Sequence, residues 1–454
     1  MRRFYLCIAL ILAPVGFVSA GEIAVVTTTD YTSGNLAAIS DGETTARTDL
    51  LPIHSDNWVV AWGGYVYVLE RLGGDNIIKL SPDDLSSPIY QKSVGDKANP
   101  YDVAFVDEHK AYVSRYGRAS VLIIDPATGD STGSVDLSAY VAYAGTDSAE
   151  SVPHMAYMAI SDGKLYIACQ RLKGWNPGDT SLIAVIDTQT DQVLESIPLN
   201  LKNPVALSLY EGRLYIACVG SWWDPTDGGI EVVDTATDRN LGVLVDESAL
   251  GGNVSGVLVV SPGKGYALVM AQWPNIQVKP FDPQEGTAGE ALPGATAAVH
   301  MAVSSSGRLY VADRSEEAPG IYIYDISDDE LVAGSVPTGL PPNSVAIVGV
   351  PTAVAETEGS LLLSPSLALP FPNPFNSRAV VPYVLGEDGY VRLAVYDMLG
   401  RKVRVLFEGR QEKGLHRAYW DGRDEEGRPV ASGIYILKLE AGGKRWARTL
   451  SLIR

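Results

Sequence analysis

The chain has 454 residues, with 35 Lys and Arg against 54 Asp and Glu, and a formal net charge of −19. A chain of this length suggests two or three domains. The acidic excess argues against a nucleic-acid partner, whose phosphates would be repelled. The charge is also uneven, because residues 367–454 hold 15 basic and 10 acidic side chains, whereas residues 21–366 hold 18 basic and 44 acidic ones. Such an acidic body is typical of a protein that stays in solution outside the cell.

The amino terminus predicts export. Arg2 and Arg3 precede an apolar run over residues 6–18, and Val18-Ser19-Ala20 forms a small-residue cleavage site. We therefore expect residues 1–20 to be a signal peptide. The apolar run is shorter than the roughly 20 residues that a membrane-spanning helix needs. No other segment is apolar and long enough to span, so we expect no integral membrane segment after cleavage.

The middle of the chain repeats a short pattern at a spacing of about 45–55 residues. A Gly with a basic residue precedes the string Leu-Tyr-Ile-Ala in Leu165–Ala168 and Leu214–Ala217, and a variant of it in Leu309–Ala312. An apolar run that ends in Asp follows each string, as in Ile183–Asp187 and Ile230–Asp234. Each unit contains four short β-branched and aromatic runs separated by turn residues, which predicts four strands per unit.

The repeat predicts an all-β fold, because units of four strands at this spacing are typical of propeller blades. Six units begin near Trp58, Tyr101, Met155, Val205, Val257 and Met301. Residues 343–350 are predicted as a first strand, which residues 22–28, 35–40 and 45–51 would complete as a further blade. We therefore expect a seven-bladed β-propeller over residues 21–350, with six blades as the alternative. The strings resemble the YVTN family of β-propeller repeats, which implies the fold and no particular activity.

Two cysteines remain after the signal peptide, Cys169 and Cys218, and both end the Leu-Tyr-Ile-Ala string. Export would permit a disulfide between neighbouring blades. Buried free thiols are the expectation that we favour, because two cysteines do not make a disulfide scaffold.

The candidate binding residues lie in loops that share one face of the predicted propeller. Aromatic rings can stack on sugars, and Trp and Arg both anchor protein interfaces. The predicted ligand-binding tryptophans are Trp175, Trp222, Trp223 and Trp273. The predicted arginines follow the second strand of four blades and are Arg71, Arg115, Arg171 and Arg314. The predicted histidines near the channel are His54, His154 and His300. The alternative is that the tryptophans cap the blades and the arginines pair with local carboxylates.

Motifs for catalysis and cofactors are scarce. The three histidines lie in different blades without a metal-ligand spacing, and the sequence has no nucleophile elbow, phosphate loop or complete calcium loop. We predict no cofactor and no metal site, although Asp224–Asp227 and Asp325–Asp329 could bind calcium. The chain is expected to bind rather than to catalyse, and an extracellular hydrolase or quinone- or metal-dependent oxidoreductase is the alternative.

Residues 351–368 predict a linker, and residues 369–454 predict a small Ig-like sandwich of short strands. The segment opens with Pro372, Asn373, Pro374, Phe375 and Asn376. It continues with Tyr396-Asp397-Met398-Leu399-Gly400-Arg401, Trp420–Asp424 and Gly433-Ile434-Tyr435. This segment resembles the C-terminal sorting domain of type IX secretion substrates, which is similar to the Ig-like domain of the flagellar hook-capping protein. The resemblance implies the type IX machinery as a partner and a secreted or cell-surface location. An extracellular glycan or an envelope protein is the expected ligand.

Overall fold

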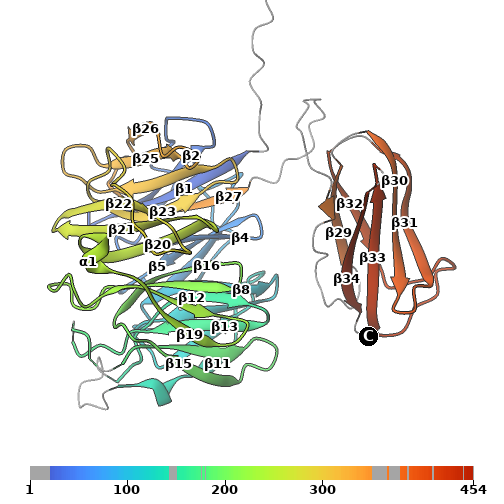
Figure 1. Ribbon diagram of the computed structural model, residues 1–454, viewed down its shortest axis with the longest axis horizontal. Coiled ribbons are helices and arrows are strands. Elements are labelled where there is room, and N and C mark those ends of the chain that lie inside the picture. Colours follow the sequence, from blue (N-terminus) through green and yellow to red (C-terminus); the bar gives the residue numbers. More distant parts are fainter. Residues whose placement is uncertain are drawn as a thin grey trace, which may run out of the picture. The chain divides into compact units, whose positions relative to one another are not determined.

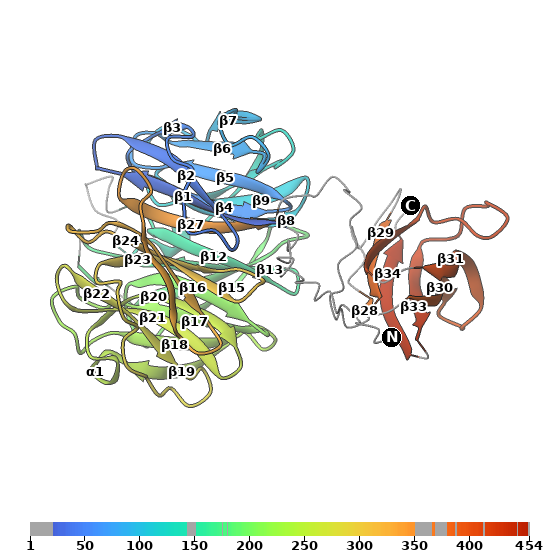
Figure 2. The same ribbon diagram turned by 90° about the horizontal axis from the view of Figure 1, so that it is seen from above.

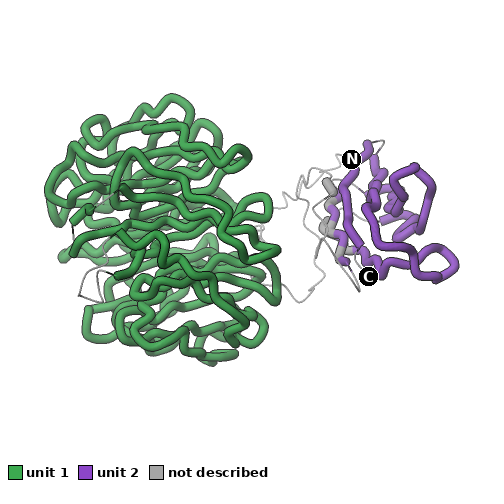
Figure 3. Tube along the Cα trace, turned by 90° about the horizontal axis from the view of Figure 1, so that it is seen from below, with its two compact units in different colours: residues 1–353 green, residues 354–454 purple. Residues whose placement is uncertain are grey.

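The structure is a computed structural model that describes residues 21–142, 151–174, 176–178, 180–349, 366–367, 379–385, 388–411, 414–442 and 444–452. The chain divides into two compact units, residues 1–353 and residues 354–454, which Figure 3 colours separately. The expected signal peptide, Trp175 and the Pro372–Asn376 motif lie outside the described residues. Among the described helices, none is long and apolar enough to cross a membrane.

The described residues of the first unit form seven antiparallel sheets, numbered here in the order in which they follow one another (Figure 1). Sheet 1 contains β27 (Pro342–Gly349), β1 (Glu22–Thr29), β2 (Gly34–Ser40) and β3 (Pro52–Ile53). Sheet 2 contains β4 (Asn57–Trp62), β5 (Tyr65–Glu70), β6 (Asn76–Leu80) and β7 (Tyr90–Ser93). Sheet 3 contains β8 (Pro100–Asp107), β9 (Lys110–Arg115), β10 (Ser120–Ile124) and β11 (Ser131–Asp136).

The later sheets repeat this plan. Sheet 4 contains β12 (Met155–Ser161), β13 (Lys164–Cys169), β14 (Leu182–Asp187) and β15 (Val193–Pro198). Sheet 5 contains β16 (Pro204–Tyr210), β17 (Arg213–Cys218), β18 (Gly229–Asp234) and β19 (Arg239–Asp246). Sheet 6 contains β20 (Asn253–Ser261), β21 (Lys264–Gln272) and β22 (Asn275–Phe281). Sheet 7 contains β23 (Ala298–Val303), β24 (Arg308–Asp313), β25 (Gly320–Asp325) and β26 (Leu331–Val336). Short helices occur at η1 (Ser138–Tyr140) and α1 (Glu247–Leu250).

The sheets form a closed ring, which is a β-propeller, so the predicted fold class is confirmed. The first strand of each sheet contacts the next sheet, and β23 of sheet 7 contacts β27 of sheet 1. Sheet 1 closes the ring by pairing strands from both ends of the unit, with Val25 opposite Ala346 (Figure 2). No strand edge is left open at this junction, and such edges promote aggregation.

The second strand of each sheet shows why these residues form strands. All residues from Leu165 to Cys169 of β13 are buried, because neighbouring sheets pack against both of its faces. A strand that is covered on both faces reads as a continuous apolar run rather than as an alternating one. The preceding turn has positive φ at Asp162 and Gly163, a conformation that a two-residue hairpin needs.

The repeated Tyr of the second strand ties each of four sheets to the next. Its hydroxyl donates to an Asp in the turn that follows the third strand of the neighbouring sheet. The described pairs are Tyr112 with Asp191, Tyr166 with Asp238, Tyr266 with Asp329, and Tyr310 with Asp41. In three of the pairs the Asp also forms an ion pair with a Lys two residues before the Tyr. The Lys-x-Tyr part of the repeat is therefore a contact between sheets.

Two parts of the strand prediction were wrong. The last strand of sheet 1 was predicted at residues 45–51, but β3 lies at Pro52–Ile53 and residue 47 forms only an isolated bridge to Ala38. A fourth strand was expected in every unit, but sheet 6 has three among the described residues. The segment after β22 contains Pro283, Gly286, Gly289 and Pro293, residues that weaken a strand, and only isolated bridges form there.

The second unit is a sandwich of two sheets. One sheet contains β28 (Ser366–Leu367), β29 (Ala379–Leu385) and β32 (Gly414–Trp420). The other contains β31 (Lys402–Gln411), β30 (Gly389–Asp397), β33 (Gly433–Ala441) and β34 (Lys444–Leu452). The buried Trp420 ring meets Tyr435 edge-on at 4.8 Å. The motif residues Asp397 and Asp424 each accept backbone N–H groups within a turn and form an ion pair with the Arg four residues later.

Candidate functional site

Exposed apolar side chains gather in the loops that join the second to the third strand of a sheet, here called the 2–3 loops. Trp223 is 86% exposed and Trp222 is 38% exposed in the loop between β17 and β18. Trp273 is 72% exposed in the tight turn between β21 and β22. Tyr31 and Leu72, in the 2–3 loops of sheets 1 and 2, are also exposed. Because equivalent strands of a propeller run in the same direction, these loops open on one face of the ring.

The loop that carries Trp222 and Trp223 is held in a defined conformation. Asp227 Oδ1 accepts the Ser221 N–H at 2.9 Å, and Asp224 Oδ1 accepts the Thr226 hydroxyl at 2.6 Å. The side-chain amide of Asn253, from sheet 6, donates to the Ser221 carbonyl at 3.0 Å. The two indoles are therefore presented by a loop that the neighbouring sheet fixes in place. One oxygen of each carboxylate considered for calcium, Asp224 Oδ1 and Asp227 Oδ1, is used in the turn.

Three of the predicted arginines bind backbone carbonyls. Arg115 donates to the carbonyls of Ser120 and Val94, and Arg171 donates to those of Tyr140 and Thr180. Arg314 donates to Pro342 and Thr29 and lies over the Tyr31 ring at 4.5 Å. These contacts favour a structural role, in which each guanidinium joins the end of its second strand to the backbone of neighbouring segments.

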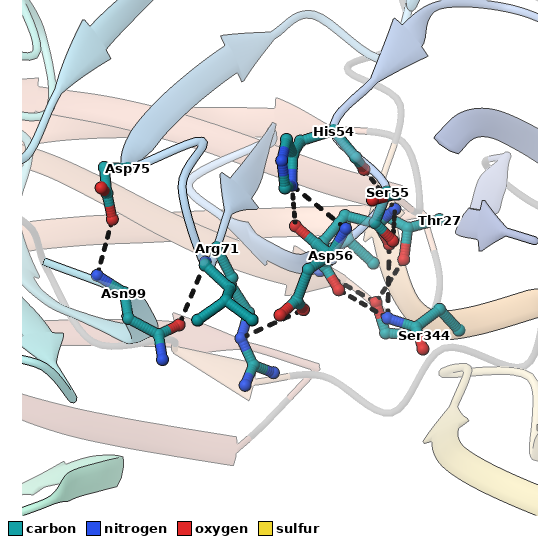
Figure 4. Close-up of polar contacts among 12 residues, drawn as sticks. Thr27, His54, Ser55, Asp56, Arg71, Asp75, Asn99 and Ser344 are labelled. Carbon is teal, nitrogen blue, oxygen red and sulfur yellow. Dashed lines mark hydrogen bonds and ion pairs between the residues drawn. The ribbon is translucent and has the colours of Figure 1, made fainter. Parts of the chain in front are cut away.

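Arg71 differs from these three arginines. Its Nε lies 3.5 Å from Asp56 Oδ1, and its guanidinium carbon lies 4.1 Å from the centre of the Tyr101 ring. Figure 4 shows its two terminal nitrogens pointing away from Asp56. The sequence predicted this residue as a ligand contact, and its placement leaves that prediction standing.

The three histidines each use a ring nitrogen on backbone. Asp56 N–H donates to His54 Nδ1 at 3.1 Å (Figure 4), Leu172 N–H donates to His154 Nδ1 at 3.2 Å, and Val345 N–H donates to His300 Nδ1 at 3.1 Å. His154 is buried, whereas His300 borders the central cavity. The described residues contain no group of three or more His, Cys, Asp and Glu that could hold a metal ion.

A central cavity of about 430 Å³ runs along the first strands of the sheets. Its wall is mostly aliphatic, with polar groups from Asp102, Tyr157 and His300 and an indole from Trp58. The Trp58 ring lies edge-on to His300 at 4.5 Å and to Tyr157 at 5.7 Å. Burial raises the pKa of the Asp102 carboxyl to about 7, although the N–H groups of Met158 and Val103 oppose that shift.

Sequence reasoning missed Asp102, Tyr157 and Trp58, and also the exposed Tyr31 and Leu72. A signal for Asp102 exists in Pro100–Val103, because an acidic residue interrupts the apolar start of a first strand. The equivalent strands start with apolar or small residues in most other units. No local signal marks Leu72, since its exposure depends on the loop leaving the sheet.

Comparison with known proteins finds a family match within the second unit. Residues 383–444 match the FlgD Ig-like domain. A comparison with curated proteins finds no match in sequence. The chain is similar in fold to Kuenenia stuttgartiensis hydrazine synthase, with 18% identity over 67% of this chain and 92% of that chain and a TM-score of 0.50.

Two further solved structures are similar to this chain. Apo AztD from Citrobacter koseri has 13% identity over 89% of this chain and 99% of that chain, with a TM-score of 0.45. The Pan2 WD40 domain from Neurospora crassa has 11% identity over 64% of this chain and 86% of that chain, with a TM-score of 0.43. At these identities the likeness concerns the fold alone. The chain is a β-propeller followed by an Ig-like unit that matches the FlgD Ig-like domain over residues 383–444.

Proposed function

We propose that the protein is an exported binding protein whose propeller face engages an extracellular glycan through Trp222, Trp223 and Trp273. The observation that carries this proposal is the exposure of large indoles on a fixed loop. Trp is a highly buried residue on average. Trp223 is 86% exposed, so its indole offers apolar area that a ligand can cover.

The surroundings of the indoles favour a sugar over an apolar protein partner. Polar groups of Ser221, Asp224 and Asp227 lie in the same loop as the rings. A sugar offers a C–H face for stacking and hydroxyl groups for hydrogen bonds with such neighbours. Because Asn253 holds the loop from sheet 6, little conformational entropy would be lost on binding.

A glycan array probed with the full chain tests this function. We expect binding to at least one class of oligosaccharide, and we expect a Trp223→Ala and Trp273→Ala double variant to lose it. Loss of one stacking anchor costs about 1.4 kcal/mol or more, which is about tenfold in affinity or more. Tyr390→Ala is the matched control, because that ring is 60% exposed on the Ig-like unit. Equal array signals from the double variant and the control would refute the proposed surface.

We further propose that the Ig-like unit directs export through the type IX machinery. The match of residues 383–444 to the FlgD Ig-like domain and the order of the sequence motifs support this role. Deletion of residues 369–454 should leave the protein in the periplasm of a host that has this machinery. Fractionation of cells and medium measures the outcome, and normal release of the truncated chain would contradict the sorting role.

A further inference from the structure

At four junctions between sheets, the same kind of hydrogen bond joins the first strands in the centre of the ring. A side chain on the first strand of one sheet accepts a backbone N–H from the first strand of the next sheet. The described pairs are Ser344 with Val59, Asp102 with Met158, Ser208 with Val259, and His300 with Val345. The donor–acceptor distances lie between 2.8 and 3.1 Å. This hydrogen bond needs only an acceptor atom on the side chain, which Ser and neutral His provide.

Asp102 is the exception, because its carboxylate brings a formal charge that the hydrogen bond between the strands does not require. Its Oδ2 accepts the Met158 N–H and its Oδ1 accepts the Val103 N–H, both at 2.8 Å. No Lys or Arg is among the described residues that line the cavity, and no ion pair joins Asp102 to a described cation. An ionised carboxylate without a cation is costly in such surroundings.

Aromatic rings border the same cavity as this carboxyl. Tyr157 lies on β12 directly before Met158, whose N–H the Asp102 carboxyl accepts. Trp58 packs edge-on against Tyr157, with the ring centroids 5.7 Å apart. Aromatic faces attract cations through the ring quadrupole, and the attraction grows when the cation is desolvated. His300 accepts at Nδ1, so its neutral ring carries hydrogen on Nε2 and adds no positive charge.

We propose that the central cavity binds a small organic ammonium ion, with Asp102 as its counter-charge and Trp58 and Tyr157 as its aromatic wall. The volume of about 430 Å³ suits a ligand of this size. The acidic excess of residues 21–366 would raise the local concentration of cations. A metal ion fits less well, because one carboxylate and an apolar wall offer too few oxygen ligands. The site is separate from the tryptophan loops and does not depend on the proposed glycan function.

Calorimetric titration of the full chain with benzylammonium chloride and with benzyl alcohol tests the proposal. The two probes have nearly the same shape and differ in charge. We expect benzylammonium to bind with a dissociation constant between about 10 µM and 1 mM, and at least about tenfold more tightly than the alcohol. Absence of binding at ~10 mM benzylammonium, well above the expected dissociation constant, would overturn the proposal. Equal affinities for the two probes would overturn it as well.

Variants separate the charge from the rings. Asp102→Asn should remove the preference for the ammonium probe, whereas Tyr157→Leu should weaken both probes about threefold to tenfold and keep the preference. Tyr390→Ala, on the Ig-like unit, should change neither affinity and is the control. A folded Asp102→Asn protein that keeps the full preference would contradict the assignment. If that variant melts early, the charge preference of the wild type and of Tyr157→Leu still decides the question.

Discussion

Two titratable side chains, His300 and Asp102, change the pH dependence of the propeller's stability in opposite directions. Burial lowers the pKa of His300 to about 4, although the Val345 N–H opposes the shift, and burial raises the pKa of Asp102 to about 7. Below pH 6.5 an unfolded chain would protonate His300 while the folded chain keeps it neutral, so folding loses stability as pH falls towards 4. The Asp102 carboxyl acts the other way, because its folded form takes up a proton below pH 7 while the unfolded form stays ionised until about pH 3.8.

The His300 contribution can be isolated with His300→Gln, whose amide oxygen can still accept the Val345 N–H. Between pH 7 and pH 4.5 we expect the wild type to lose more stability than the variant, by up to about 3 kcal/mol. Melting temperatures of both proteins at the two pH values measure the difference. Parallel losses in the two proteins would show that His300 is not held neutral in the folded chain.

The two cysteines are predicted to be inert in the native protein. Cys169 packs between sheets 3 and 4, Cys218 packs between sheets 4 and 5, and both are free thiols. Burial raises the pKa of Cys169 to about 12 and that of Cys218 well above its usual value. A thiol reagent should therefore label neither cysteine until denaturant is added, after which both should react. Rapid labelling of the folded chain would contradict this packing.

Residue roles were the hardest feature to predict from the sequence. The loop tryptophans Trp222, Trp223 and Trp273 are exposed, and their role as ligand contacts stays a prediction. The arginine positions were found, but their acceptors were not, because Arg115 and Arg314 bind backbone carbonyls from other sheets of the ring or from the segments next to them. The local sequence shows where an arginine donor lies. The carbonyl that accepts from it depends on how neighbouring sheets are arranged. The same reason hid the cross-sheet role of Asp102.

At the scale of elements, the Tyr–Asp contact explains a residue that has no partner. Tyr67 of sheet 2 is fully buried, and its hydroxyl has no hydrogen-bond partner among the described residues. The turn of sheet 3 that should supply the Asp has Gly129 with φ of 76°, and a side chain there would meet Tyr90 at 2.7 Å. The hydroxyl of Tyr67 is thus left without its acceptor because the neighbouring turn has no room for one.

The contact predicts opposite effects for two similar substitutions. Tyr166→Phe removes a hydroxyl that donates to Asp238 at 2.6 Å, and it should lower the free energy of unfolding by about 1–3 kcal/mol. Tyr67→Phe removes an unsatisfied buried hydroxyl, and it should leave stability unchanged or raise it. Thermal melting of the two variants beside the wild type checks both values. A Tyr67→Phe protein that is as destabilised as Tyr166→Phe would contradict this account.

Strand positions were largely predictable, because each unit repeats a buried second strand between turn residues with positive φ. In the second unit the predicted strand at residues 379–385 coincides with β29. The errors fell on outer strands, where burial supplies less signal. Most of β15 and β26 is exposed or half-buried, and the outer position of sheet 6 contains Gly and Pro instead of a strand.

At the scale of the molecule, ring closure by β1 and β27 completes the propeller within residues 22–349. The FlgD Ig-like unit has a hydrophobic core of its own around Trp420 and Leu437. We therefore expect a chain of residues 21–350 to fold without the Ig-like unit. Its far-ultraviolet circular dichroism and cooperative melting should show this, and a truncated chain that aggregates or melts without cooperativity would contradict it.

The central claim is that the propeller binds its extracellular ligand through the exposed tryptophans of the 2–3 loops. The most direct test is calorimetric titration of the full chain with the best oligosaccharide from the array, alongside the Trp223→Ala and Trp273→Ala double variant. We predict one binding event in the wild type and an affinity at least about a hundredfold weaker in the double variant, from about tenfold for each ring. An unchanged dissociation constant in a double variant that melts like the wild type would contradict the claim.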